Sequence, residues 1–285
     1  MLTGKTKVLG VFGHPIGHSL SPAMQNAAIG ELRLDYVYVP FDIEPAELGQ
    51  AVAAIRSLGI VGVNVTIPHK EKIIDFLDEV SEEAGAIGSV NTVHNDRGRL
   101  KGYSTDGEGF LGPLRREGFD PQGKRAVVLG AGGSAKAVTH ALAGSGCSVT
   151  VLNRTPERGA ALAEQVNEAV SSEVVRAMPL APGDAMERTI REASLLVNCT
   201  SVGMHPDVGE SPCSKDLLHP RLLVYDLVYN PVSTRLLQEA EEAGAKAMSG
   251  VKMLVHQGAE SFRIWLHRDP PLGIMEEVVM SALAE

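Results

Sequence analysis

The chain is poor in cysteine and has no surplus of positive charge. Its three cysteines, Cys147, Cys199 and Cys213, are odd in number and show no CxxC spacing, which argues against a disulfide framework and against a zinc site. The net charge is -9, so the chain as a whole does not attract nucleic acid or anionic membranes. We therefore expect reduced thiols, no bound metal, and partners that are neither nucleic acid nor membrane. A local basic site for a small anion stays open.

Long hydrophobic runs are absent as well. No run approaches the ~20 apolar residues that a membrane helix needs. The opening stretch MLTGKTKVLGVFGHP lacks the apolar core and the cleavage site of a signal peptide. Apolar residues make up 44% of the chain and charged residues 21%, as in ordinary globular proteins. We expect a cytoplasmic protein whose 285 residues form one large domain or two smaller ones.

Short β-branched runs alternate with helical patterns along the first hundred residues. Alternation of this kind predicts a parallel or mostly parallel sheet with helices on both faces. The expected strands are 7–13, 35–41 and 60–67, and the expected helices are 21–32 and 44–58.

The alternation restarts near residue 125, which indicates a second sheet with its own core. The expected strands are 125–130, 148–153, 172–178, 193–199 and 221–229, and the expected helices are 132–146, 156–166 and 233–244. Two closing helices at about 250–267 and 271–284 have no strand between them, so they should pack on an existing sheet. We expect a two-domain α/β protein, with residues 1–106 and 250–285 in one domain and 107–249 in the other.

A glycine-rich turn opens the second domain. In VVLGAGGSAKA, Gly130, Gly132 and Ala135 form a GxGxxA frame that directly follows a predicted strand and starts a helix. Such glycines let the backbone approach a pyrophosphate, and the helix N-terminus supplies free N–H groups. The alternative is a tight turn without a ligand. The context favours a Rossmann-type dinucleotide-binding domain.

The end of the next strand bears on the choice of cofactor. A chain that binds NAD usually carries Asp or Glu there for the ribose hydroxyls, whereas this one has NRTPER. Asn153 does not repel a 2′-phosphate, and Arg154 offers a fork of donors that suits one. Thr155 either bonds the same phosphate or caps the helix that begins at Pro156. With Arg158 one turn further on, the pattern favours NADP over NAD.

Two serines precede the first predicted helix, in GHSLSPAMQN. Ser21 followed by Pro22 predicts a helix N-cap, and a helix start also attracts anions. Ser19 is not needed as a cap. The two hydroxyls together suit the carboxylate of a substrate.

The stretch VNVTIPHKE ends a predicted strand and turns at once to Lys70. Asn64 and Thr66 alternate on that strand and so point the same way, although buried strands of parallel sheets are usually apolar. Ligands of open α/β sheets bind at this end of the strands. Lys70 is then either a proton donor in a cleft or an ordinary solvated lysine at the start of a helix.

Other polar residues strengthen the first interpretation. Asp106 could belong to a simple Asp-Gly turn, and Asn91 could bond only backbone, but together beside a dinucleotide site they favour function. Near the C-terminus, Gly250, Met253 and Gln257 share one helix face. That face would be an ordinary core face if the glutamine did not need a polar partner.

The motifs in sequence order resemble those of the shikimate dehydrogenase family. They cover nearly the whole chain: PIGHSLSP, GVNVTIPHK, GSVNTV, YSTDGEGF, GAGGSAKAV, NRT, NCTSVGM, DLVYNP and GVKMLVHQ. The resemblance implies NADP-linked, reversible reduction of 3-dehydroshikimate to shikimate in the biosynthesis of chorismate and aromatic amino acids. One position departs from the family pattern, because Ser249 stands where an aspartate is usual.

The resemblance also implies roles for individual residues. Lys70 and Asp106 match the catalytic pair of the family. The positions that match substrate contacts are Ser19, Ser21, Thr66, Asn91, Asp106, Tyr229 and Gln257. The positions that match NADP contacts are Gly130, Ala131, Gly132, Gly133, Ser134, Asn153, Arg154, Thr155, Arg158, Leu227, Gly250, Met253 and Glu82.

Two alternatives remain at this stage. One is a quinate/shikimate dehydrogenase with relaxed use of substrates and of NAD or NADP. The other, from a different class, is a non-catalytic NADP-binding sensor, against which the retained Lys70 and Asp106 argue. We expect a monomer or a homodimer.

Overall fold

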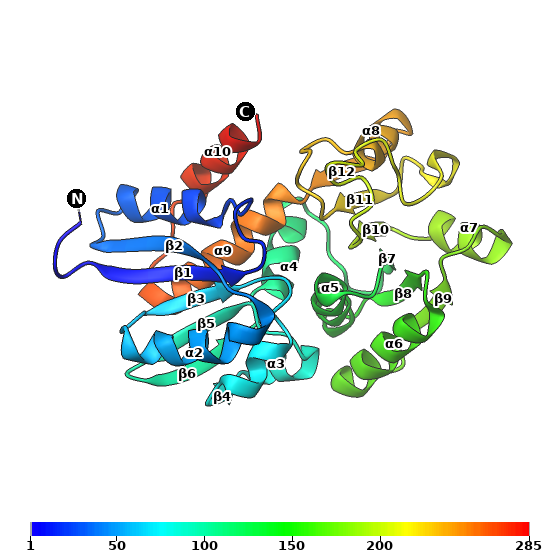
Figure 1. Cartoon of the computed structure of the whole chain (residues 1–285). Coiled ribbons are helices and arrows are strands. Elements are labelled where there is room, and N and C mark those ends of the chain that lie inside the picture. The colour runs from blue at the N-terminus through cyan, green and yellow to red at the C-terminus, as the bar shows by residue number, and fades with distance from the viewer. Residues whose placement is uncertain (1, 285) are drawn as a thin grey trace. The chain divides into compact units, whose positions relative to one another are not determined.

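The computed structural model describes residues 2–284, which form two compact units of α/β structure (Figure 1). The chain passes from the first unit to the second after Gly109 and returns after Leu254. Both divisions fall a few residues beyond the boundaries at 106/107 and 249/250 that the sequence patterns indicate.

The first unit contains a six-stranded sheet with the order β2-β1-β3-β5-β6-β4. Its strands are β1 (Lys7–Gly13), β2 (Tyr36–Asp42), β3 (Gly62–Val65), β4 (Glu79–Val80), β5 (Thr92–Asp96) and β6 (Arg99–Tyr103). The pairs β1–β2, β1–β3 and β4–β6 are parallel, whereas β5 runs antiparallel to both β3 and β6. The β5–β6 hairpin turns through Arg97 and Gly98, which both have positive φ. That combination suits a tight two-residue hairpin turn.

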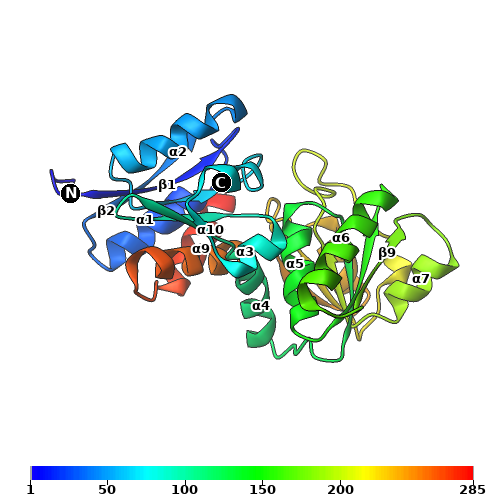
Figure 2. The same cartoon turned by 90° about the horizontal axis from the view of Figure 1, so that it is seen from below.

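Helices cover both faces of this sheet. The helical segments are α1 (Ser21–Glu31), η1 (Pro45–Glu47), α2 (Leu48–Ser57), η2 (Lys72–Phe76), α3 (Glu82–Ile87), α9 (Val251–Leu266) and α10 (Leu272–Leu283). Helices α1, α9 and α10 lie on one face and α2 lies on the other (Figures 1 and 2). The buried core under α2 joins Val52 and Ile55 to Val63 and Val65 of β3.

On the opposite face, Trp265 of α9 packs directly on the sheet. Its Nε1 donates a hydrogen bond to the carbonyl oxygen of Val93 at 3.0 Å. A Cβ added to Gly62 would collide with the indole ring. The glycine in β3 therefore lets α9 approach, and this approach brings the polar face of α9 to the edge of the site described below.

The second unit contains a fully parallel six-stranded sheet with the order β12-β11-β10-β7-β8-β9. Its strands are β7 (Arg125–Leu129), β8 (Ser148–Asn153), β9 (Val175–Pro179), β10 (Leu195–Asn198), β11 (Leu223–Asp226) and β12 (Lys246–Ser249). The strand order reverses direction between β7 and β10, as in the Rossmann fold, and ligands bind such folds at this switch point.

Successive residues of the strands point to opposite faces of the second sheet, and each face has its own hydrophobic core. Val128 joins the core under α5 and α6, and the neighbouring Val127 joins the core under α7 and α8. The helical segments of this unit are α4 (Asp106–Arg116), which starts in the first unit, α5 (Gly133–Gly144), α6 (Pro156–Val170), α7 (Asp184–Arg191), η3 (Lys215–Leu217) and α8 (Arg235–Glu242). Within residues 2–284, the helices are too short or too polar to cross a membrane.

Candidate active site

The turn after β3 fixes the main chain of Lys70. The N–H of His69 donates to the carbonyl of Thr66 at 2.9 Å, and the N–H of Val90 donates to the carbonyl of Lys70 at 2.8 Å. The imidazole of His69 is buried, with its Nε2 2.7 Å from the carbonyl oxygen of Ile43. The Lys70 side chain therefore starts from a fixed backbone at the carboxyl end of a sheet strand.

Lys70 and Asp106 form a partly buried ion pair. The Nζ of Lys70 lies 2.6 Å from Oδ2 of Asp106, and the two side chains are 19% and 6% exposed. Asp106 is the first residue of α4, where the helix dipole favours a negative charge. Shielding from water strengthens the attraction between the two charges. The Lys70 side chain is only partly buried, so the ion pair is not sealed inside the core.

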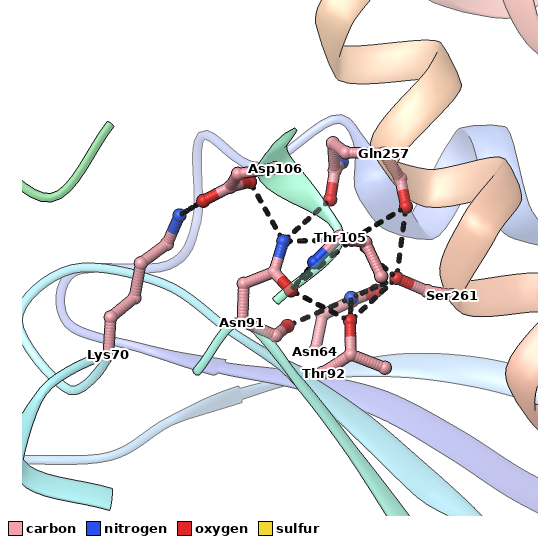
Figure 3. A network of polar contacts seen from close by, with 8 residues as sticks. All are labelled: Asn64, Lys70, Asn91, Thr92, Thr105, Asp106, Gln257 and Ser261. Carbon is pink, nitrogen blue, oxygen red and sulfur yellow. Dashed lines mark hydrogen bonds and ion pairs between the residues drawn. The ribbon is translucent and has the colours of Figure 1, made fainter. Parts of the chain in front are cut away.

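Asn91 holds the second oxygen of Asp106 (Figure 3). Its Nδ2 donates to Asp106 Oδ1 at 2.8 Å, while its Oδ1 accepts the N–H of Thr105 at 2.9 Å. Because that N–H can only donate, the amide must keep its oxygen toward Thr105 and its NH₂ toward Asp106. The side-chain oxygen of Gln257 lies 3.5 Å from the same Nδ2. An ammonium, a carboxylate and two amides thus gather in the first unit.

This arrangement suits proton transfer to or from an oxygen of a small polar ligand. The ammonium of Lys70 can donate a proton, which is the usual task of a general acid. The carboxylate of Asp106 holds that ammonium in place, and Asn91 and Gln257 can bond neighbouring hydroxyl groups.

The loop between β7 and α5 leaves open space beside backbone N–H groups. Gly130 has a φ of +104°, a conformation that favours glycine. Gly132 precedes the first residue of α5, and no side chain caps that helix. A Cβ added to Gly132 or Gly133 would meet nothing within 4 Å. The start of this twelve-residue helix therefore fits the phosphates of a dinucleotide. The predicted loop residues Ala131 and Ser134 lie in the same segment.

Two arginines follow the neighbouring strand β8. Arg154 and Arg158 are exposed, and no carboxylate pairs with either of them within residues 2–284. Asn153 ends β8 and donates from Nδ2 to the carbonyl of Thr155 at 2.8 Å. Thr155 stands at the N-cap of α6, which starts at Pro156 as predicted, but its side chain makes no capping bond. The strand ends in the neutral Asn153, and the two exposed arginines follow it with Glu157 as the acidic residue between them. A neutral strand end followed by two cations fits a phosphate group better than a bare ribose hydroxyl.

Comparisons with known proteins agree with this geometry. Residues 11–93 match the family model described as shikimate dehydrogenase substrate binding domain, and residues 114–210 match shikimate/quinate 5-dehydrogenase. Residues 250–280 match the shikimate 5'-dehydrogenase C-terminal domain. The chain is 51% identical over 282 residues to the shikimate dehydrogenase (NADP(+)) of Methanopyrus kandleri, covering 98% of this chain and 97% of the relative. The chain belongs to the shikimate dehydrogenase family.

Solved structures of the family share the whole fold. A shikimate dehydrogenase in complex with NADP+ superposes with a TM-score of 0.94 at 37% identity, over 100% of this chain and 98% of the other. The Thermus thermophilus enzyme, in complex with NADP(H) and shikimate, gives 0.88 at 42% identity over 97% and 100%. The two-domain α/β fold and the oxidoreductase class predicted from the sequence are therefore confirmed.

The serine pair of this shikimate dehydrogenase family member differs from the prediction in one detail. Ser21 does not cap α1, because the helix already includes it and the cap position belongs to Leu20. Instead, the hydroxyl oxygen of Ser19 accepts the N–H of Ser21 at 3.3 Å. The prediction that Ser21 is the cap of this helix is wrong. Both side chains remain half-buried at the helix start.

Three other predicted positions belong to different parts of the two units. Thr66 is half-buried just beyond the end of β3, with its methyl group facing Gly13. Glu82 is exposed in the first turn of α3. Tyr229 belongs to the second unit, where burial raises the pKa of its hydroxyl. Their contacts with a ligand remain predictions.

The predicted nicotinamide positions come together within the second unit. A Cβ added to Gly250 would collide with the carbonyl oxygen of Leu227. Met253 is buried in the core against which Leu227 packs. The unusual Ser249 accepts the N–H of Val251 with its hydroxyl oxygen at 3.4 Å. The start of α9 therefore keeps a side-chain contact at the position where this family usually has aspartate.

The sequence reasoning missed three buried hydroxyl groups behind Asn91. They belong to Tyr38, Thr92 and Ser261. Ser261 follows Gln257 by four positions, so it lies on the same helix face, and this spacing was the available signal. No comparable signal marks Tyr38 within its apolar strand.

Proposed function

We propose that this chain catalyses the reversible, NADP-linked reduction of 3-dehydroshikimate to shikimate, on the route to chorismate and the aromatic amino acids. The Lys70–Asp106 ion pair, with Asn91 on the far oxygen of the carboxylate, is the observation that supports this function most strongly. The relatives described above carry the same activity in their names, and two of the solved structures contain NADP.

Lys70 handles the proton of the reaction. During reduction the carbonyl oxygen of the substrate gains negative charge, and the ammonium group of Lys70 donates a proton to it. During oxidation the neutral amine takes that proton back from the hydroxyl group. Asp106 keeps the amine at its position and offers its own oxygens to a neighbouring hydroxyl. Bound NADP supplies or accepts the hydride.

The remaining polar residues of the first unit orient the substrate. Ser19 and Ser21 bind its carboxylate at the start of α1, where helix N–H groups also favour an anion. Thr66, Asn91 and Gln257 bond the ring oxygens, and we assign Tyr229 of the second unit to the substrate as well. These assignments are proposals that rest on residue type, on position and on the family motifs.

The second unit binds the cofactor. The loop from Gly130 to Ser134 takes the pyrophosphate, and Asn153, Arg154, Thr155 and Arg158 take the 2′-phosphate and adenosine. We assign Leu227, Gly250 and Met253 to the nicotinamide, which they would contact in the bound cofactor. We assign Glu82 to a cofactor contact on the family motif alone.

A direct assay tests this function. Purified protein is mixed with shikimate and NADP, and the formation of NADPH is followed by its absorbance. The proposal predicts steady turnover that depends on both compounds. A non-catalytic NADP-binding sensor would bind NADP in a calorimeter yet form no NADPH, and that result would remove the proposal.

The quinate/shikimate alternative is not favoured. Quinate carries an additional hydroxyl at the carbon that bears the carboxylate, so the Ser19–Ser21 region should discriminate against it. We expect a higher kcat/KM for shikimate than for quinate, and a higher value with NADP than with NAD. Equal values for both acids would restore the alternative.

The cellular setting completes the proposal. All three cysteines are free, which is compatible with the reducing cytoplasm that we assign to this protein. We assign a monomer or a homodimer, and light scattering at working concentration distinguishes the two.

A further inference from the structure

A layer of buried polar side chains lies directly behind Asn91. Tyr38, Asn64, Thr92 and Ser261 are 1%, 6%, 0% and 0% exposed. Polar groups in a protein core cost free energy unless they are hydrogen-bonded, and a hydroxyl is easily replaced by an apolar group of the same shape. Four buried polar side chains in contact with one another therefore indicate a role beyond packing.

In this layer, each hydrogen bond leads from a donor to an acceptor that lies one step closer to Asn91. The side-chain oxygen of Asn91 is an acceptor, so the hydroxyl of Thr92, 3.0 Å away, must donate to it. The hydroxyl of Ser261 lies 2.8 Å from that of Thr92. Because the Thr92 proton is already used, a hydrogen bond between the two hydroxyls requires Ser261 as the donor, and its single proton then does not serve the carbonyl oxygen of Gln257.

The same order of donors and acceptors holds on the side of the layer away from Asn91. The oxygen of Ser261 accepts Nδ2 of Asn64 at 2.8 Å, and Oδ1 of Asn64 accepts the hydroxyl of Tyr38 at 2.7 Å. The Asn64 amide cannot flip easily, because its Nδ2 also donates to the carbonyl of Asn91 at 3.1 Å. The carbonyl oxygen of Gln257, 3.1 Å from the Ser261 oxygen, is the competing acceptor for the same Ser261 proton. The layer thus touches α9 and β5 together (Figure 3).

We propose that Thr92 and Ser261 are positioning residues, which orient the Asn91 amide toward Asp106 through a one-way chain of hydrogen bonds that starts at Tyr38. Without the Thr92 hydroxyl, the oxygen of Asn91 keeps the N–H of Thr105 and, at 3.2 Å, its hydroxyl, but loses the Thr92 donor at 3.0 Å. The NH₂ group of Asn91 then holds Asp106, and through it Lys70, less firmly. This proposal rests on the proposed function, because its effect is measured on that reaction.

The test compares Thr92→Val with Thr92→Ser. Valine keeps the shape of threonine and removes the hydroxyl, whereas serine keeps the hydroxyl. Thr92→Val should lower kcat/KM for shikimate about three- to tenfold, the loss of one ordinary hydrogen bond, with KM for NADP unchanged. Thr92→Ser should recover most of the wild-type value. A purely structural role would lower the melting temperature without this pattern.

Two controls make the result decisive. Thr150→Val removes a buried hydroxyl from β8 in the second unit and should leave kcat/KM for shikimate unchanged. Ser261→Ala interrupts the chain at another member and should lower kcat/KM at least about threefold. If Thr92→Val does not fold, Ser261→Ala provides the test instead, and wild-type kinetics in Ser261→Ala would then overturn the proposal.

The outcomes separate this proposal from the proposed function. A wild-type protein that forms no NADPH from shikimate overturns both. An active wild type with an equally active Thr92→Val overturns the positioning role alone, as does a Thr92→Ser variant that is as impaired as Thr92→Val. Activity lost in Thr92→Val and recovered in Thr92→Ser supports it.

Discussion

The ammonium group of Lys70 lies 2.6 Å from one carboxylate oxygen of Asp106, and the other oxygen accepts the amide of Asn91 at 2.8 Å. Both oxygens of the carboxylate are thereby held. The position of Lys70 therefore depends on Asp106, and the position of Asp106 depends on Asn91.

Asp106→Asn should lower kcat/KM for shikimate by about 10²-fold or more, a loss comparable to that of a general acid–base group. The new asparagine at position 106 can still accept the amide of Asn91 with its oxygen. Its NH₂ group then points toward the ammonium of Lys70, so that two hydrogen-bond donors face each other. Steady-state kinetics measure the effect. Asp78→Asn is the control, because it removes a half-exposed ion pair with Arg56 from a carboxylate that otherwise accepts the N–H of Leu100 at 2.7 Å, and its kinetics should match the wild type. An Asp106→Asn variant as active as this control would show that the ion pair is dispensable.

Arg154→Ala should weaken the binding of NADP far more than that of NAD. The guanidinium is exposed and has no carboxylate partner within residues 2–284, so a phosphate is its natural partner. Calorimetric titration with both cofactors measures the difference. Arg188→Ala, an exposed arginine on α7, should change neither. An equal loss for NADP and NAD in Arg154→Ala would remove the phosphate assignment.

Gly250→Ala should destabilise the protein by roughly 1–3 kcal/mol, the usual cost of overpacking. The new methyl group would meet the carbonyl oxygen of Leu227, so β11 and the start of α9 must move apart. Thermal unfolding measures the effect. Gly144→Ala, at the end of α5, meets open space and should be neutral or slightly stabilising. Equal melting temperatures for the two variants would contradict the close packing at Gly250.

The protein should lose stability as the pH falls below about 6.5. Burial lowers the pKa of His140, and burial, opposed in part by Asp96, lowers the pKa of His94. The unfolded chain, with histidine pKa values near ~6.5, binds protons more readily than the folded chain. The contribution of these histidines to the free energy of unfolding is therefore complete above the unfolded pKa. It is lost as the pH falls through the lower pKa values that they have in the folded protein.

His140→Gln isolates this effect, because it should flatten the dependence of the melting temperature on pH below about 6.5. His205→Gln, at an exposed position, should leave the dependence as it is. A wild-type slope in the His140→Gln variant would show that this side chain does not contribute.

Local chemistry explains which parts could be predicted from the sequence. The glycine loop after β7 lies where expected, because strand, turn and helix are adjacent in the chain. The same holds for the turn that carries Lys70. The Lys70–Asp106 contact spans 36 positions, and the family motifs, rather than spacing, pointed to it.

Long-range contacts explain what could not be predicted. Asn64 and Ser261 are 197 positions apart, and only the approach of α9 to the first sheet brings them together. The β5–β6 hairpin escaped notice because its turn places Arg97, a residue without a strong turn preference, at positive φ. Ser21 resembled an N-cap because Pro22 follows it, yet the helix begins one residue earlier than that pattern suggests.

The measurement that tests the central claim most directly is the steady-state kinetics of Lys70→Ala with shikimate and NADP. If Lys70 handles the proton, kcat should fall by about 10²–10⁴-fold while KM for shikimate changes little. A large rise in KM at a nearly intact kcat would contradict the account, because Lys70 would then be a binding residue only.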